Sequence, residues 1–229
     1  MRKVTLACAI LLLSGVTAPV VAEEDSGFSA NVTLASDYSF RGWSQTTRDP
    51  AIQGGFDYDF GNGFSIGTWG SNINFGASTT MEWDLYMGFG GSMNESTEWS
   101  ASLIRFEYPS EGDALDYIEL HLNFAISDLS FGIAYSPDYL GDGGPTFFYP
   151  NAGYSMSLGE SAALDVGIGM SMTDEDSFFA DGEDSYIDYS ATVTVPFEGL
   201  DLAFGLVGTN LDSGGDTDPR LVLSLSKSF

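Results

Sequence analysis

Carboxylates are the most abundant side chains in this sequence that could take part in chemistry. The 229 residues include 33 Asp and Glu, a single histidine, His121, and a single cysteine, Cys8. Nucleophilic and metal-dependent catalysis usually places a histidine beside the reacting group, and no HExxH metalloprotease motif occurs. We therefore expect no enzyme and no catalytic residue, and we interpret His121 as a structural or channel-lining side chain.

Two acidic runs could bind divalent cations. Neither has the spacing of a calcium-binding EF-hand loop, so we expect solvated loops, no metal site and no cofactor. A weaker alternative is that these loops hold Ca²⁺ or Mg²⁺ and bridge to anionic lipopolysaccharide. The acids concerned are Asp174, Glu175, Asp176, Asp181, Glu183 and Asp184 in the first run, and Asp212, Asp216 and Asp218 in the second.

The elements that carry most other acids have a period of two. Apolar residues alternate with polar ones, which indicates β-strands with one apolar and one wet face. In 118–126, for example, Ile118, Leu120 and Leu122 alternate with Glu119 and His121. The same pattern covers 28–40, 52–60, 81–89, 164–172, 187–195, 200–206 and 221–229. Segment 64–74 is less regular, and 97–108 changes phase between Leu103 and Ile104, which suggests a β-bulge.

The connections between these strands alternate in length. Short links fall at 61–63, 92–96, 127–128, 159–161 and 198–199, and mostly longer ones at 42–50, 76–80, 109–116, 137–146, 173–185 and 211–218. Short turns on one side and long polar loops on the other are typical of a bacterial outer-membrane barrel. The pattern predicts an all-β fold: one antiparallel transmembrane barrel of about twelve strands, with long extracellular loops and short periplasmic turns.

Aromatic residues favour this barrel over a soluble β-sandwich, which has no reason to place them at strand ends. One predicted belt follows the long loops: Tyr38, Phe40, Trp43, Trp83, Tyr108, Tyr135, Phe147, Phe148 and Tyr186. The other follows the short turns: Phe60, Phe64, Phe89, Trp99, Phe124, Phe197 and Phe229. The less favoured interpretation is a secreted or periplasmic sandwich.

The wet face of a barrel lines its lumen, so the alternation also predicts the pore-lining residues. Carboxylates at close quarters attract cations and repel anions, which predicts a cation-preferring pore. We expect Arg41 and Arg105 to pair with Asp37, Glu107 or Glu119 and to set the narrowest point. The predicted lining residues that bear on charge selectivity are Asp37, Arg41, Asp57, Asp84, Arg105, Glu119, His121, Asp165, Asp188 and Asp201, with Asp59 in the same phase.

The two ends of the chain agree with export to the outer membrane. Arg2 and Lys3 precede an apolar run that ends near Ala22, typical of a cleaved signal peptide over residues 1–22. We expect a short periplasmic segment at 23–27 and the barrel over 28–229. The last strand, with Leu221, Leu223, Leu225 and Phe229, resembles the carboxyl end that the assembly machinery reads in outer-membrane proteins, with Lys227 as a departure from the usual apolar residue.

The net charge is −26, and loss of Arg2 and Lys3 with the signal peptide lowers it to −28, since five cations then remain against 33 acids. Nucleic-acid binding needs Lys and Arg against the phosphates, so we exclude nucleic-acid partners. The partners that we expect are outer-membrane lipid, lipopolysaccharide, the assembly machinery and small hydrophilic solutes.

The stretch SDYSFRGWSQTTRDPAIQGGFDYDFGNGFSIGTWGSNINF (36–75) resembles the opening of the TorF-type porin family of Gram-negative bacteria, and DYIELHLNFA and YSPDYLGDGG are also similar to it. This resemblance implies an outer-membrane barrel with a diffusion pore and supplies no site residues. We expect passive diffusion of small solutes. The alternative is a non-conducting barrel that acts as a structural or surface-binding module through its acidic extracellular loops.

Overall fold

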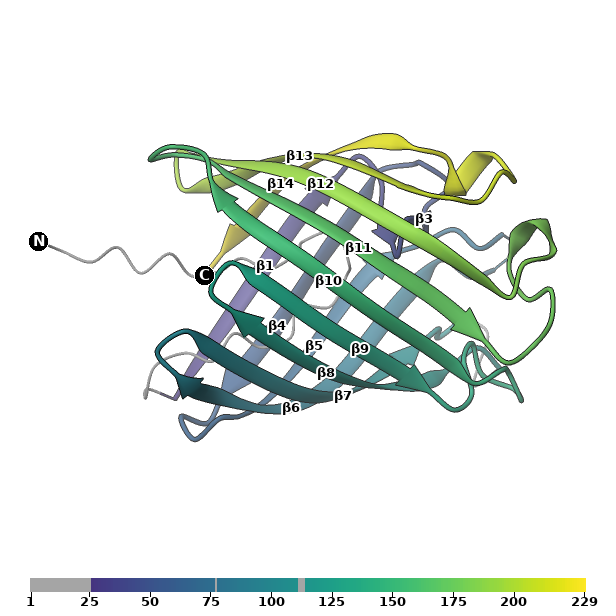
Figure 1. The fold of residues 1–229 in the computed structure, drawn as a ribbon, viewed down its shortest axis with the longest axis horizontal. Helices are drawn as coiled ribbons and strands as arrows, with labels where there is room; N and C mark the ends of the chain where they lie inside the picture. Colours follow the sequence, from purple (N-terminus) through teal and green to yellow (C-terminus); the bar gives the residue numbers. More distant parts are fainter. Residues whose placement is uncertain (1–25, 77, 111–113) are drawn as a thin grey trace, which may run out of the picture.

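The computed structural model describes residues 26–76, 78–110 and 114–229. The predicted signal peptide, residues 1–22, lies outside the described residues. Twelve antiparallel strands form a closed barrel, so the predicted fold class and strand number are confirmed (Figure 1). The barrel strands are β1 (Gly27–Ala35), β4 (Ala51–Asp59), β5 (Phe64–Asn72), β6 (Met81–Asn94), β7 (Thr97–Glu107), β8 (Tyr117–Ile126), β9 (Leu129–Ser136), β10 (Phe147–Ser157), β11 (Ala163–Thr173), β12 (Ser185–Phe197), β13 (Leu200–Thr209) and β14 (Arg220–Ser228).

The remaining elements lie in the long loops. A two-stranded sheet, β2 (Ser39–Phe40) with β3 (Trp43–Ser44), forms a hairpin within the first loop, and short 3₁₀ helices occupy Ala180–Gly182 and Gly215–Thr217. Neighbouring barrel strands pair in sequence order, and β14 closes the barrel against β1. Figure 1 shows the long loops at one end and the short turns with the C-terminus at the other. We call these the outer and the periplasmic end.

The outward face of the wall is apolar. Each strand alternates between an exposed apolar side chain and an inward one, as in β6, where Leu85 and Met87 are exposed while Asp84 and Tyr86 are buried. Such an apolar band suits contact with the hydrocarbon of a membrane. Because the barrel is closed, no strand edge leaves backbone N–H and C=O groups unpaired in the lipid. The aromatic belt predicted at the periplasmic end faces outward, with Phe60, Phe89, Phe124, Phe197 and Phe229 all exposed.

The predicted belt at the outer end is wrong for most of its members. Trp83, Tyr135 and Phe148 are exposed on the outward face, but the other six aromatics lie inside the barrel, packed with one another. These six are Tyr38, Phe40, Trp43, Tyr108, Phe147 and Tyr186. They fill space left by the barrel wall, so the outer half of this barrel has an aromatic core of its own.

The bulge predicted between Leu103 and Ile104 is also absent from the ladder. Leu103 pairs with Leu120 and Ile104 with Glu119 in unbroken register, while the one register shift between β6 and β7 lies in β6, between Ser92 and Asn94. The sequence pattern changes here because Ile104 and Phe106 face the lumen, where they pack in the aromatic core. In the sequence, an apolar side chain that faces the lumen therefore resembles a change in the phase of the alternation.

Candidate functional site

The first loop, residues 36–50, folds into the barrel instead of standing above it. Its β2-β3 hairpin carries Phe40 and Trp43 into the aromatic core, where Phe40 lies 6.0 Å from Phe106 and Trp43 lies 6.2 Å from Tyr186 between ring centroids. Tyr38, just before the hairpin, contacts the Trp69 ring edge-on at 5.4 Å. The loop therefore touches strands on several sides of the lumen.

Arg41, at the tip of the hairpin, forms the first attachment of this loop to the wall. Its guanidinium donates to both carboxylate oxygens of Glu119 on β8, at 2.9 and 2.6 Å. The same group lies within 4.6 Å of the ring centroids of Phe40, Phe147 and Tyr149. A bidentate pair with aromatic faces around it is the arrangement that arginine favours when buried.

Burial alone would lower the pKa of Arg41, but the charge of Glu119 and its hydrogen bonds raise it above its ordinary value. Arg41 therefore stays charged while 4% exposed. His121 Nε2 lies 2.7 Å from Glu119 Oε2, the oxygen that also accepts a hydrogen bond from Arg41. This contact makes His121 a partner of the ion pair, in line with its predicted structural role.

Arg220, on β14, forms the second attachment. It pairs with Asp37, and its guanidinium also donates to the Gly42 carbonyl oxygen at 2.8 Å and to the Ser39 hydroxyl at 3.0 Å. Asp37 accepts further hydrogen bonds from the Ser44 and Thr46 hydroxyls. One arginine of the wall thus holds both the first strand of the hairpin, at Ser39, and its turn, at Gly42.

Gly42 shows how closely the hairpin approaches the wall. Its φ of +79° is a conformation that residues with a side chain rarely adopt, and a Cβ atom there would lie 2.7 Å from the Gly208 carbonyl oxygen and 2.9 Å from Asp188 Cβ. Only glycine combines this positive φ with the absence of a Cβ atom that would collide with Gly208 and Asp188. The turn of the hairpin is therefore in van der Waals contact with β12 and β13.

The remaining inward carboxylates have no cationic partner among the described residues. The Tyr86 hydroxyl donates to Asp57 at 2.7 Å, that of Tyr149 to Asp188 at 3.1 Å, and that of Ser155 to Asp165 at 2.6 Å. Neither carboxylate oxygen of Asp84, which is fully buried, has a hydrogen-bond partner within the described part of the chain. Since both inward arginines are occupied by Asp37 and Glu119, the lumen keeps an excess of acidic groups.

One acidic residue in this set was not among the predicted site residues. Glu82 is buried and accepts hydrogen bonds from the Tyr38 hydroxyl at 2.7 Å and the Tyr108 hydroxyl at 3.1 Å. Its phase, two positions before Asp84, already places it on the wet face. Arg220 was missed as well, although it shares the phase of Ser224 and Ser226.

The structure brings most of the predicted lining residues to the inward face. Asp57, Asp84, Glu119, His121, Asp165, Asp188 and Asp201 have the inward phase of their strands, with Asp201 exposed near the periplasmic end. Asp37 and Arg41 reach the lumen through the first loop. Their effect on charge selectivity stays a prediction.

The prediction for Arg105 is wrong. Its register partners Leu85 and Ile118 face outward, and Arg105 does too, with its side chain 44% exposed. There it pairs with Glu107 at 2.7 Å and Asp116 at 2.9 Å. The residue lies near the outer end of β7, where the outward face leaves the hydrocarbon, so a charge there costs little.

A second loop, residues 173–185, also folds inward in part. Phe179 is buried against Tyr186 at 4.8 Å and Phe178 lies 6.1 Å from Tyr139. The acids of this loop remain at the surface, and Asp181 accepts a hydrogen bond from the Asp212 backbone. Among the described residues, no three His, Cys, Asp or Glu side chains are close enough to hold a metal ion.

The pentapeptide Gly63–Gly67 (GFSIG) fits the GxSxG pattern of a hydrolase nucleophile. Ser65 lies on an antiparallel barrel strand and not on the strand-to-helix turn that this motif needs. Within the described residues, His121 is hydrogen-bonded to Glu119 and forms no hydrogen bond with Ser65. The pattern therefore carries no catalytic assignment.

Comparison with solved structures shows the same fold. A NanC porin structure superposes with a TM-score of 0.56 at 9% identity, covering 87% of this chain and 98% of that one. The KdgM porin gives 0.53 at 10% identity, and KdgM in complex with disordered oligogalacturonate gives 0.55 at 10%, each covering 88% of this chain and 99% of the other. A search of curated proteins found no match.

The closed barrel with its apolar outward face places the chain in the outer membrane of a Gram-negative cell. Within the described residues, no helix has the length and apolar character needed to cross a bilayer. A family model matches residues 21–228, almost the whole chain. The chain therefore belongs to the Gcw_chp family, described as bacterial protein of unknown function.

Proposed function

We propose that this protein is a porin-like channel for passive diffusion of small hydrophilic solutes, that it prefers cations, and that its first loop narrows the outer half of the lumen. The observation that carries this proposal is the unequal charge of the inward face. The two inward arginines, Arg41 and Arg220, are paired with Glu119 and Asp37. Asp57, Asp165 and Asp188 accept hydrogen bonds from hydroxyl groups and form no ion pair within the described residues.

This charge distribution argues for a different solute from that of one structural neighbour. KdgM was solved with oligogalacturonate, a polymer that carries a carboxylate on each sugar. A lumen whose unpaired charges are carboxylates repels such a polymer and concentrates cations. We therefore favour small cationic or neutral solutes, and we assign no chemical step to the channel.

The resemblance to TorF-type porins fits this function and remains part of the proposal. So does the role of Phe229 as an assembly signal, and so do lipopolysaccharide contacts through the acidic outer loops. Ca²⁺ or Mg²⁺ bridging by these loops would need ligands from lipopolysaccharide, because the described side chains supply no cluster of three.

Liposome swelling tests the proposal directly. Refolded mature protein is placed in liposomes, and swelling is followed with a small amine, a neutral sugar and a carboxylate of similar size. We expect the amine to enter faster than the sugar and the carboxylate slowest. Fastest entry of the carboxylate would contradict cation preference, and swelling no faster than in protein-free liposomes would contradict the channel.

A second candidate function, a non-conducting structural or surface-binding barrel, is favoured by one observation. The aromatic core crosses the outer half of the barrel and includes residues of the first loop. A variant in which residues 38–46 are replaced by a flexible linker distinguishes the two. If the wild type does not conduct and the variant does, the loop is a plug. A non-conducting variant that still folds would support the structural role.

A further inference from the structure

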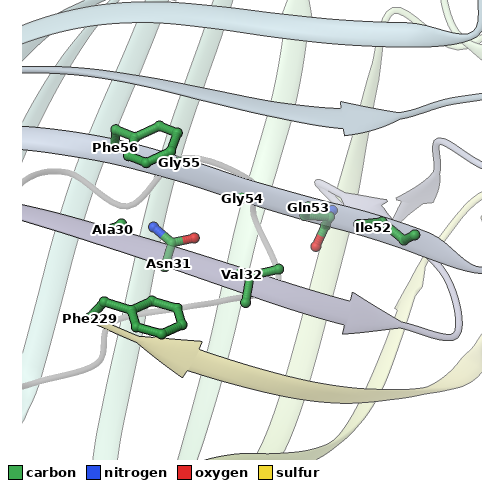
Figure 2. A pocket seen from close by; sticks show the side chains of 9 residues that line it. All are labelled: Ala30, Asn31, Val32, Ile52, Gln53, Gly54, Gly55, Phe56 and Phe229. Carbon is green, nitrogen blue, oxygen red and sulfur yellow. The ribbon is translucent and has the colours of Figure 1, made fainter.

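An apolar notch lies on the outward face of the barrel beside the C-terminus. Its volume is about 550 Å³. Figure 2 shows the rings of Phe56 and Phe229 on either side of Ala30, with Gly54 leaving a gap between Phe56 and Ile52. The notch therefore forms where two small outward residues stand between large ones, on the seam where β1 meets β4 and the end of the chain.

The position of the notch assigns it to the periplasmic half of the membrane. Phe229 is the last residue, and its backbone exchanges hydrogen bonds with Ala30 at 3.2 and 2.9 Å. Phe229 is 70% exposed and belongs to the aromatic belt at the periplasmic end. The lipid that meets this surface is consequently a phospholipid of the inner leaflet.

Lys227 lies directly beside the notch. It pairs with Val32 in the β1-β14 ladder, shares the outward phase of Leu223 and Leu225, and its ammonium group is 5.4 Å from the centroid of the Phe229 ring. After Lys3 it is the only lysine in the sequence. A lone cation on the outward face needs an anion, because charge there is costly in lipid.

That anion is not supplied by the described residues. Arg41, Arg48, Arg105 and Arg220 all pair with carboxylates, whereas Lys227 forms no ion pair with a described residue. The other charged side chains of the periplasmic turns are acids, among them Asp128, Glu160 and Glu198. An anionic headgroup is thus repelled around this end of the barrel except at Lys227.

We propose that Lys227 and the notch together bind one phospholipid of the inner leaflet with an anionic headgroup. The Lys227 ammonium contacts the phosphate while one acyl chain packs over Ala30 and Gly54 between Phe56 and Phe229. In lipid, van der Waals packing takes the place of the hydrophobic effect as the source of affinity for an apolar surface, and the lysine adds attraction for the headgroup. The inference does not depend on whether the lumen conducts.

Native mass spectrometry of the refolded mature protein in detergent tests this site. The probe is phosphatidylglycerol with long acyl chains, compared with phosphatidylcholine of the same chains and with phosphatidylglycerol of short chains. We expect one phosphatidylglycerol per barrel, with weaker binding of both other lipids. Lys227→Gln should weaken phosphatidylglycerol about five- to tenfold, and Lys227→Arg should retain it.

A second variant tests the notch itself. Ala30→Leu fills the space for the acyl chain and should weaken the long-chain lipid while leaving the short-chain lipid nearly unchanged. Ala152→Leu is the matched control, because Ala152 also faces outward, on β10 beside Phe131 and Ile168. Heat-dependent migration on gels shows that each variant has folded.

Three results would overturn the proposal. Equal binding of phosphatidylglycerol to the wild type and Lys227→Gln would show that Lys227 does not recognise the charge of the headgroup. Equal binding of the long-chain lipid to Ala30→Leu and Ala152→Leu would show that the acyl chain does not occupy the notch. Detection of a dimer that Ala30→Leu abolishes, without bound lipid, would assign the notch to a second copy of this chain.

Discussion

Arg41 and Glu119 lie 78 positions apart in the sequence and form a bidentate ion pair inside the barrel, with side chains 3% and 0% exposed. Both charges have been removed from water, so each depends on the other for compensation. This pair differs from Arg105 with Glu107, which lies on the outward face and is partly exposed. The contrast between the two pairs leads to the first prediction.

Glu119→Gln should lower the free energy of unfolding by about 3–5 kcal/mol, because it leaves Arg41 buried without its counter-charge. Glu107→Gln is the matched control and should cost at most about 1 kcal/mol, since water screens that pair. Urea unfolding of both variants in detergent measures the difference. Equal losses for the two variants would mean that Arg41 finds another partner when Glu119 is neutral.

Tyr139, in the loop between β9 and β10, gives a prediction for alkaline pH. Burial raises its pKa from 10.0 to about 12, against the opposing charge of Arg41. The folded state therefore holds this proton more tightly than the unfolded state does. The resulting stability is complete below pH 10 and is lost as the pH rises toward 12.

Tyr139→Phe should accordingly lose less stability between pH 10 and 12 than the wild type does. The difference between the phenolate absorbance of the two proteins should have its midpoint near pH 12. A midpoint near 10 would show that Tyr139 is in contact with water, contrary to its stacking on Phe147 at 4.1 Å.

At the scale of single residues, the sequence predicted the face of the strand on which a side chain lies better than it predicted the residue with which that side chain pairs. Alternation places Glu119, His121 and Asp188 correctly because one face of each strand must meet hydrocarbon. It fails for Arg105, since a residue beyond the hydrocarbon can face outward and carry charge. It cannot reveal that Asp37 pairs with Arg220, 183 positions away, because that contact depends on the closure of the whole barrel.

At the scale of elements, the first loop is the feature that distinguishes this barrel from a simple open cylinder. Arg220 holds the hairpin at Ser39 in its first strand and at Gly42 in its turn, Arg41 binds Glu119 from the same turn, and Gly42 fits against β12 and β13. Alternation predicts strands, but the loop lacks a repeating pattern, so its inward course could not be predicted. For the same reason the sequence pattern places Tyr38, Phe40 and Trp43 of this loop in a membrane belt, whereas the structure packs them inside the barrel.

Gly42→Ala should release the hairpin from the wall, since a Cβ atom collides with Gly208 and Asp188. Gly143→Ala is the control: its φ of +80° resembles the +79° of Gly42, but no atom lies within 4 Å of the added carbon. Limited trypsin digestion provides the measurement, because Arg41 is buried and is cut only when the hairpin leaves the lumen.

Faster cleavage after Arg41 in Gly42→Ala, and unchanged cleavage in Gly143→Ala, would establish that close packing holds the loop. The same acceleration in both variants would attribute the effect to backbone strain alone. No acceleration in either would mean that the two ion pairs keep the hairpin in place without the glycine contact.

At the scale of the whole molecule, the acids behind the net charge of −26 lie mainly in the outer loops and in the lumen. The outer loops carry acids such as Asp174, Glu183 and Asp212 at the surface, and the lumen carries Asp57, Asp165 and Asp188 without cationic partners. Under the proposed function, a solute that enters from outside would meet carboxylates first at the entrance and then along the wall. The sequence predicted this distribution because loop acids and inward acids follow from connection length and from strand phase.

The reversal potential of the refolded protein in a planar bilayer, under a gradient of potassium chloride, tests the central claim most directly. An acidic lumen predicts a potential with the sign of potassium selectivity, and a smaller potential for Asp57→Asn and Asp165→Asn, with Arg105→Gln unchanged because that residue faces outward. A potential of chloride selectivity, or no conductance even after the first loop is replaced, would contradict the account.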